Sequence, residues 1–263
     1  MPHDRQTGRV LLVGAGPGAA DLLTLRAARA LAEADAVLFD ALVDPQALAL
    51  ARPNCLKLQT GKRAGKASLK QATINRLMLR LARRGLLVVR LKGGDPSIFG
   101  RSGEETEFLE AHGIKVEIIP GVTAASAAAA QFGFPLTHRG EARRLIFATV
   151  RAHDGGVTEL GWPALADREA TVVLYMGRDS ARTAAARIMS QGRSPSTPAL
   201  AVENAGSQSA RLVRTDLAGL GETVEAAGFT GPVILLIGEA AARARRGNET
   251  SLRGCRAAAA GSN

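Results

Sequence analysis

Cysteines, aromatic residues and long apolar runs are all scarce in this sequence of 263 residues. Cys55 and Cys255 form neither a metal-binding nor a redox spacing, and two cysteines cannot build a disulfide framework. No apolar stretch approaches the roughly 20 residues that a membrane-spanning helix needs. The first residues also lack the basic start and apolar core of a signal peptide. We therefore expect a cytoplasmic protein with no membrane partner and no metal site.

The charge of the chain is strongly one-sided. Its formal net charge is +10 at pH 7, and arginine far outnumbers lysine. A basic module that binds nucleic acid is one interpretation, motivated by Arg143-Arg144 and by the arginines between residues 243 and 256. Aromatic residues make up only 3%, however, so a stacking platform for single strands is poorly supplied. Because the planar guanidinium binds two oxygens at once, we expect an anionic ligand. Given the shortage of aromatic residues, we expect no nucleic-acid partner.

Hydrophobic residues make up 46% of the chain, which is enough for a sizeable core, and the length favours two domains. In the first half, apolar β-branched runs alternate with helical patterns, which is typical of βαβ units and a mainly parallel sheet. Strands are predicted at residues 10–13, 36–39, 55–59, 86–91 and 116–119. Helices are predicted near residues 22–33, 69–84, 104–112 and 123–131.

A second series of strands and helices follows a polar segment without periodicity at residues 133–144. Strands are predicted at 145–149, 171–175, 199–202, 211–214 and 233–237, with helices near 181–191 and 217–227. The predicted fold class is therefore α/β, with two α/β domains and a cleft between them. The expected boundaries are residues 1–140 and 141–240, followed by a disordered basic tail at 241–263.

The most informative motif is Gly93-Gly94-Asp95-Pro96, which follows the buried strand predicted at 86–91. Ligands of open α/β sheets bind outside the carboxyl ends of such strands. Paired glycines let the backbone approach a ligand closely, and proline stiffens the loop. Asp95 can accept hydrogen bonds from a hydroxyl or an amine. These residues are also ordinary turn formers, so the segment alone leaves a plain turn as the alternative.

A second glycine-rich loop at residues 14–19, Gly-Ala-Gly-Pro-Gly-Ala, follows the first predicted strand. It satisfies a relaxed dinucleotide fingerprint, and Asp40 sits about where that fold has its ribose-binding acid. A flavin or nicotinamide oxidoreductase is therefore an alternative. Against it, the next helix is expected to begin only after Ala20-Asp21, so that the loop does not lead directly into a helix dipole.

Two helix starts carry further candidates. Ser102 followed three residues later by Glu105 predicts a capping box, whereas Glu104 has no capping role. Arg101 precedes this helix and is expected at the same edge of the sheet. Near Thr123 the chain makes another tight strand-to-helix transition. Thr123 either caps that helix, or the small residues there let a ligand sit on backbone amides.

Taken together, these motifs resemble the tetrapyrrole methylase family. The order and spacing of the family's motifs hold from about residue 9 to residue 239. One such motif is a weak signal, but the whole series is highly specific. The matching segments are residues 13–18, 23–25, 39–40, 42–43, 61–63, 90–96, 99–101, 103–105, 120–126, 135–139, 175–177, 192–195 and 202–204.

The resemblance implies a homodimeric methyltransferase that uses S-adenosyl-L-methionine and releases S-adenosyl-L-homocysteine. The expected reaction is C-methylation of uroporphyrinogen III at C2 and C7, through precorrin-1 to precorrin-2, which leads to sirohaem, cobalamin or haem d1. Methylation of another precorrin is the alternative. The residues that correspond to the family's cofactor contacts are Pro17, Gly93, Gly94, Asp95, Ile98, Thr123, Ala124, Met176 and Ala205.

The same resemblance assigns roles in catalysis and substrate binding. Asp40 corresponds to a proton acceptor and Lys62 to a proton donor, while Arg101, Glu104 and Arg139 correspond to residues on the substrate side. The sequence departs from the family's usual pattern around these positions. Ala41 stands where an arginine is common, and Ser97 and Ser102 replace a phenylalanine and a glycine. Residues 149–151, Thr-Val-Arg, replace Thr-Gly-His. These changes leave the expected cofactor site intact and bear on the substrate contacts.

Overall fold

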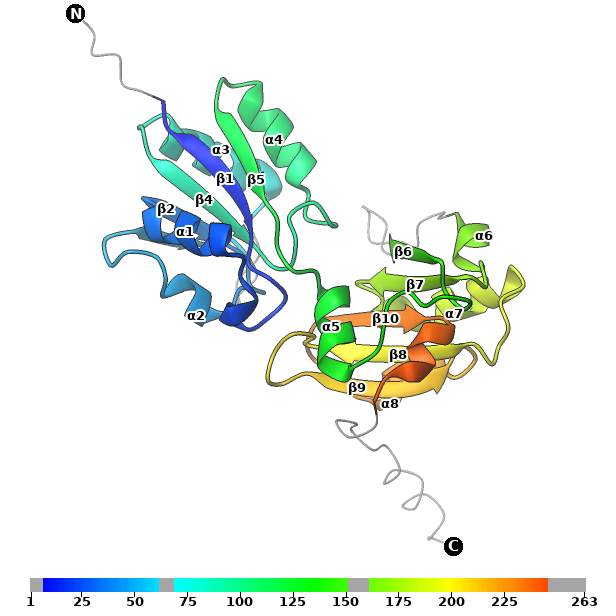
Figure 1. Ribbon diagram of the computed structural model, residues 1–263. Helices are drawn as coiled ribbons and strands as arrows, with labels where there is room; N and C mark the ends of the chain where they lie inside the picture. Colours follow the sequence, from blue (N-terminus) through cyan, green and yellow to red (C-terminus); the bar gives the residue numbers. More distant parts are fainter. Residues whose placement is uncertain (1–6, 62–68, 151–160, 246–263) are drawn as a thin grey trace, which may run out of the picture. The chain divides into compact units, whose positions relative to one another are not determined.

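The computed structural model describes residues 7–61, 69–150 and 161–245 (Figure 1). The chain divides into two compact units, each with its own five-stranded sheet. The first unit extends to Ala124 and also includes Gly206–Gln208, and the second contains Ala125–Ala205 and the chain from Ser209 onward. Both units combine helices with a sheet, which confirms the predicted α/β class. The observed strands coincide with the predicted ones to within two residues at each end.

The sheet of the first unit is entirely parallel, as the alternation of strands and helices predicts. Its strand order is β3-β2-β4-β1-β5, so the first strand of the chain lies inside the sheet. The carboxyl ends of all five strands therefore lie along one edge. The strands are β1 (Arg9–Gly14), β2 (Ala36–Phe39), β3 (Leu56–Gln59), β4 (Leu87–Lys92) and β5 (Lys115–Ile119).

Helices cover both faces of this sheet. Along β1, Leu11 and Val13 belong to the core shared with α1, whereas Val10 and Leu12 belong to the core shared with α3 and α4. This alternation follows from the two-residue period of a strand that is buried on both faces. The helices are α1 (Leu25–Glu33), α2 (Pro45–Leu48), α3 (Gln71–Ala82) and α4 (Ser102–Glu110), and a 3-10 turn, η1 (Ala20–Leu22), precedes α1.

The sheet of the second unit is mixed, with strand order β6-β7-β10-β8-β9. Only β6 and β7 pair in parallel, and the other three pairings are antiparallel. This sheet is therefore not mainly parallel like the first. The connection from β8 to β9 is too short for the crossover that parallel neighbours need. The strands are β6 (Arg144–Thr149), β7 (Ala170–Tyr175), β8 (Pro198–Glu203), β9 (Arg211–Asp216) and β10 (Val233–Ile237).

Helix α5 (Ala124–Phe132) belongs almost entirely to the second unit, so the division lies at its start rather than near residue 140. The Ala125 amide donates to the Tyr175 hydroxyl at 3.4 Å, and the Arg245 amide donates to the Phe132 carbonyl at 2.8 Å. The unit's other helices are α6 (Trp162–Leu165), α7 (Ala181–Ser190) and α8 (Leu220–Ala226), with the 3-10 turns η2 (Arg178–Ser180) and η3 (Glu239–Arg243).

The expected disordered tail begins with ordered residues, which corrects the predicted boundary at residue 241. Ala241 and Ala244 are buried, and the Arg214 guanidinium donates to the carbonyl of Ala244 and, at 2.7 Å, to that of Arg245. The sequence predicts disorder here because alanines and arginines follow one another without an apolar period. The rest of the predicted tail, residues 246–263, lies outside the described residues. Among the described helices, none has the length and apolar character needed to cross a membrane.

Candidate functional site

Three neighbouring strands of the first unit end level with one another. In the parallel register Gly14 of β1 lies opposite Lys92 of β4, and Phe39 of β2 lies opposite Leu91 of β4. The loops that follow these strands carry the glycine-rich segment, Asp40 and the Gly93-Gly94-Asp95 motif. Because ligands of α/β sheets bind at the carboxyl edge, this is the candidate site.

The loops touch one another through their backbones. The Gly94 amide donates to the Gly16 carbonyl at 2.7 Å, and the Gly16 amide donates back at 3.2 Å. A Cβ atom on Gly14 would lie 2.6 Å from the Gly121 Cα and 2.7 Å from the Gly94 oxygen. Contacts this short exclude any side chain at Gly14. The glycine loop after β1 is therefore needed for packing against the neighbouring loops.

The geometry of that loop differs from a dinucleotide site. After the loop the chain makes the turn η1, and α1 begins only at Leu25, where the Thr24 side chain accepts from the Ala27 amide at 3.1 Å. The predicted late helix start is confirmed. The loop amides do not continue into a helix N-terminus, so the fingerprint of a flavin or nicotinamide enzyme lacks its expected structural context.

The paired glycines after β4 serve different purposes. A Cβ atom on Gly93 would lie 2.9 Å from the Leu42 Cβ, so Gly93 is packed beneath the loop that follows β2. Gly94 has a left-handed φ of +70°, and no atom lies within 4 Å of the place where its Cβ would be. A ligand can therefore lie directly against the Gly94 backbone, which a side chain would prevent.

Asp95 holds this loop in place. One carboxylate oxygen, Oδ2, accepts from the Gly121 amide at 3.0 Å. The other, Oδ1, accepts from the Ser97 amide at 2.7 Å and from the Ser97 hydroxyl. The serine that replaces the family's usual phenylalanine thus supplies a hydrogen bond to the loop. Oδ1 thus has two donors, whereas Oδ2 has one and keeps a second acceptor position for a ligand.

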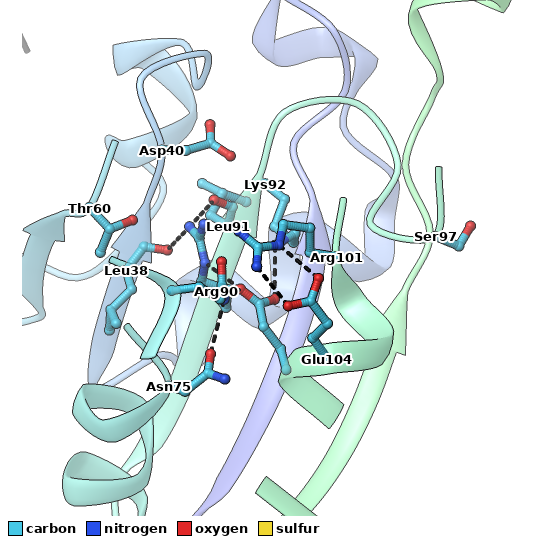
Figure 2. A network of polar contacts seen from close by, with 12 residues as sticks. Leu38, Asp40, Thr60, Asn75, Arg90, Leu91, Lys92, Ser97, Arg101 and Glu104 are labelled. Carbon is cyan, nitrogen blue, oxygen red and sulfur yellow. Dashed lines mark hydrogen bonds and ion pairs between the residues drawn. The ribbon is translucent and has the colours of Figure 1, made fainter. Parts of the chain in front are cut away.

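Asp40 lies beside this loop, half-buried at the end of β2. Its Oδ2 accepts from the Gly93 amide at 3.4 Å, and its Oδ1 accepts from the Leu42 amide at 3.2 Å. Figure 2 shows Asp40 at the edge of the sheet, above a network of buried polar side chains. Lys62, the predicted proton donor, lies outside the described residues.

Arg101 and Glu104 form a two-pronged ion pair at the start of α4. The Arg101 Nε donates to Glu104 Oε1 at 2.8 Å, and Nη2 donates to Oε2 at 2.6 Å. Both side chains are about half exposed, and the Glu104 carboxylate raises the pKa of Arg101. Arg101 itself adopts a left-handed conformation with φ +59°. The pair therefore presents a fixed guanidinium with one side already occupied by a carboxylate.

The capping box predicted for Ser102 and Glu105 is wrong. Ser102 is the first residue of α4, and no side chain caps the helix. Glu105 is fully buried and accepts instead from Arg90 Nε at 3.3 Å, from Lys92 Nζ at 2.8 Å and from the side-chain Nε2 of Gln71 at 2.9 Å. The carboxylate of Glu105 binds the two cations on β4 instead of reaching back to the helix start.

The sequence did contain a signal for this network. Arg90 and Lys92 interrupt an apolar strand at alternate positions, so both point to the same face, and buried cations require an anion. Burial, and then the Arg90 guanidinium, lower the pKa of Lys92, while the Glu105 carboxylate opposes this effect. In Figure 2 the Arg90 and Lys92 side chains lie beside the start of α4.

The predicted site residues are thus divided between the two units. Arg139, Met176 and Ala205 belong to the second unit, where Arg139 is exposed, Met176 follows β7 and Ala205 is buried after β8. The following predicted residues share the first unit: Pro17, Asp40, Gly93, Gly94, Asp95, Ile98, Arg101, Glu104, Thr123 and Ala124.

Strained backbone marks the same loops. In the described part of the chain, the non-glycine residues with positive φ are Phe99, Arg101, Met176 and Asn204. Each lies in a segment that the family resemblance singles out. Such conformations cost about 1–3 kcal/mol each and cluster at functional sites. The sequence does not predict this conformation at Phe99, Arg101 or Met176, whose side chains ordinarily avoid it, whereas asparagine adopts it more readily.

The chain belongs to the tetrapyrrole (corrin/porphyrin) methylase family, whose model matches residues 9–221. A siroheme synthase of Chromobacterium violaceum is 45% identical over 234 residues, which cover 89% of this chain and 50% of the relative. The chloroplastic S-adenosyl-L-methionine-dependent uroporphyrinogen III methyltransferase of Arabidopsis thaliana is 43% identical over 233 residues, covering 88% of this chain and 63% of the relative. This chain thus spans about half the length of the siroheme synthase that it matches.

The fold is also found in a solved structure of similar size. Uroporphyrin-III C-methyl transferase from Thermus thermophilus, complexed with S-adenyl homocysteine, is 42% identical and superposes with a TM-score of 0.76. The match covers 89% of this chain and 93% of that one. The predicted family and fold are confirmed by these likenesses.

Proposed function

We propose that this protein transfers methyl groups from S-adenosyl-L-methionine to C2 and C7 of uroporphyrinogen III, giving precorrin-2 by way of precorrin-1. One observation carries the proposal: the open, left-handed backbone at Gly94 lies at the carboxyl edge of the parallel sheet, one loop away from the Arg101–Glu104 pair. The names of the Arabidopsis relative and the Thermus structure support the same reaction and cofactor.

The residues at this edge fit such a cofactor. Gly94 leaves room for close approach to its backbone, and the half-buried Pro17 and Ile98 offer apolar contact from two loops. Asp95 fixes the loop and keeps acceptor capacity for a hydroxyl or an amine. We add Thr123, Ala124, Met176 and Ala205 as further contacts by family likeness. When bound, the cofactor supplies an electrophilic methyl group on a sulfonium centre.

Arginine side chains are the proposed partners of the substrate's carboxylates. Arg101 presents its guanidinium in a fixed orientation because Glu104 holds it on one side. A bidentate guanidinium discriminates carboxylate position better than a lysine ammonium does. Arg139 is exposed in the second unit and is proposed for the same task. Methyl transfer to carbon depends on such positioning, because the attacking carbon must align with the methyl group.

Proton removal is the remaining requirement, since methyl transfer leaves the macrocycle with an added positive charge until it loses a proton from another ring position. Asp40 is the proposed acceptor, because it is an acid at the same edge whose two oxygens are oriented by the Leu42 and Gly93 amides. Lys62 is retained as the proposed donor. Holding Asp40 by backbone amides fixes its direction without requiring another side chain to move.

Incubation with uroporphyrinogen III and S-adenosyl-L-methionine, followed by mass analysis, tests the reaction. We expect products that have gained one and then two methyl groups. Titration with S-adenosyl-L-homocysteine by calorimetry measures cofactor binding separately. Binding without methylation of uroporphyrinogen III, but with methylation of a later precorrin, would move the substrate assignment to that compound. Loss of both signals would contradict the methyltransferase itself.

We also propose that the active form is a cytoplasmic homodimer. The support is the family likeness. Sedimentation equilibrium at several protein concentrations measures the mass in solution, and we expect twice the mass of one chain. A monomer with full methyltransferase activity would contradict the proposal.

A further inference from the structure

The loop between β4 and α4 is anchored at two separate places. Its first residues are held from the front, where Gly94 pairs with Gly16 and Asp95 binds the Gly121 amide. Its far end is held from behind by the buried network around Glu105, on the first turns of α4. The front anchor consists of the Gly94–Gly16 backbone pair and the Asp95 carboxylate, whereas the rear anchor is a separate cluster of charged side chains. The two ends can therefore be disturbed independently.

The rear anchor is fully buried and tightly satisfied. Glu105 has no exposed surface, and the side chains of Arg90 and Lys92 are each 6% exposed. The Arg90 Nη1 also donates to the carbonyls of Leu38 at 3.4 Å and Leu91 at 3.2 Å. A buried carboxylate with several charge-assisted donors is held in one geometry. The network thereby ties α4 to the central strand of the sheet.

Glu105 is also joined directly to the residues proposed to face the substrate. Its amide donates to the Arg101 carbonyl at 3.3 Å, and Glu104 is its neighbour in the chain. A Cβ atom on Gly100 would lie 3.2 Å from the Lys92 Cε, so the lysine stem lies against the end of the loop. A shift of Glu105 must therefore move the Arg101–Glu104 pair.

We propose that Glu105, held by Arg90 and Lys92, is a positioning residue that fixes the Arg101–Glu104 pair for substrate carboxylates. As far as it concerns the substrate, this inference rests on the proposed function. It assigns the network to the substrate side of the site, because the cofactor loop at Gly93–Asp95 keeps its own front anchor.

The first variant is Glu105→Gln, which keeps the shape of the side chain and removes its charge. We expect kcat/KM for uroporphyrinogen III to fall about 100-fold, as a displacement of about 1 Å can cause. The dissociation constant for S-adenosyl-L-homocysteine should stay within about threefold of wild type, because the front anchor is intact. Glu105→Asp keeps the charge but has one methylene less, and should recover only part of the loss.

Glu117→Gln is the matched control. Glu117 is on β5 of the same unit and faces Arg26 at 3.9 Å in an exposed ion pair. It should leave kinetics and cofactor affinity at wild-type values. A second variant guards against unfolding of Glu105→Gln. In Arg90→Met/Lys92→Met/Glu105→Leu the buried charges are removed together, which proteins often tolerate without loss of the fold. We expect this protein to fold, bind S-adenosyl-L-homocysteine normally and turn over slowly.

Hydrogen exchange supplies a readout that does not depend on the substrate. Amides at the start of α4 should exchange about tenfold faster in Glu105→Gln and in the triple variant, while those of Gly94 and Gly121 stay protected. Unchanged exchange at α4, or faster exchange with wild-type kcat/KM, overturns the inference. Equal loss of cofactor affinity and turnover overturns it as well. If wild-type protein fails to methylate uroporphyrinogen III, the proposed function falls, and exchange at α4 still decides whether the network anchors Arg101.

Discussion

Glu105 in the first unit and Glu203 in the second are both buried glutamates, but they are satisfied in different ways. Among the described residues, all donors to the Glu105 carboxylate are side chains, and two of them are cations. Glu203 ends β8, and its Oε1 accepts from the backbone amides of Thr230 and Gly231, both at 2.6 Å. Its Oε2 accepts from Arg211 Nη1 at 3.2 Å.

The difference shows what each carboxylate would leave behind if its charge were lost. Arg211 is one-third exposed, donates to the Ala227 carbonyl at 2.6 Å and lies over the Phe229 ring. It keeps these partners without Glu203. Arg90 and Lys92 are nearly inaccessible to water, so without Glu105 two buried cations remain. In a buried side-chain network, the loss of one charge thus leaves other buried charges without a partner. A carboxylate bound by backbone amides leaves no buried charge behind.

The largest expected effect compares the two glutamates directly. Glu105→Gln should lower the free energy of unfolding by about 3–5 kcal/mol, because breaking a buried ion pair leaves an uncompensated charge. Glu203→Gln should cost about 1–3 kcal/mol, as expected for weakened hydrogen bonds to buried groups. Urea denaturation followed by circular dichroism measures both.

Fluorescence sharpens this comparison because the single tryptophan, Trp162, is buried in the second unit. If the units unfold separately, Glu105→Gln should shift the circular dichroism transition and leave the Trp162 transition in place. Glu203→Gln should move the Trp162 transition. Equal losses in the two variants would show that the type of partner makes no difference.

The second effect concerns the two arginines proposed for the substrate. Arg101→Ala should reduce kcat/KM about 100-fold, because it removes the guanidinium that is proposed to bind and orient a substrate carboxylate. Arg101→Lys should recover little of this activity. In the part of the chain that the structure describes, no side chain orients the Arg139 guanidinium, so Arg139→Ala should have a smaller effect. Steady-state kinetics checks the order, and wild-type activity in both alanine variants would remove the substrate from this site.

A third comparison uses two glycines with the same left-handed backbone conformation. Gly94 has φ +70° and Gly113 has φ +75°, and both have open space where a Cβ would be. Alanine at either position should therefore destabilise the fold by a similar amount, about 1–2 kcal/mol. Only Gly94→Ala should weaken the binding of S-adenosyl-L-homocysteine, since only the alanine side chain at this position would occupy the proposed cofactor site. Calorimetry on the two variants tests this, and equal affinities would place the cofactor elsewhere.

The smallest expected effect is a pH dependence in the second unit. A hydrogen bond from Arg144 lowers the pKa of Asp167 in the folded state. Because the folded pKa lies below the unfolded one, this stabilisation is present above the unfolded value of about 3.9 and is lost as pH falls through the folded value. Asp167→Asn should therefore flatten the acid side of the stability profile. Thermal unfolding between neutral and acid pH measures it, and parallel profiles would contradict the assignment.

Strand positions could be predicted because they depend on local pattern. The apolar runs that became β1 and β4 are buried on both faces, and the loops after them contain the glycines that close packing requires. Helix α2 was missed although Asp44 caps it and Pro45 begins it, because four residues are too few for a periodic pattern. The antiparallel pairings of the second sheet could not be predicted either, since the sequence of a strand does not show which strand it pairs with.

The order and type of the residues were enough to predict the family, the α/β class and the segments that form the candidate site. Each depends on residue types in a fixed order. The folded chain was needed to show that Glu105 binds Arg90 and Lys92 and does not cap its helix. The segment from Ser102 to Glu105 is compatible with a capping box and with buried ion pairs. Which of the two forms depends on which charged groups are removed from water. Burial brings a strand and a helix together across 13 and 15 residues of chain, and only there do two cations need this carboxylate.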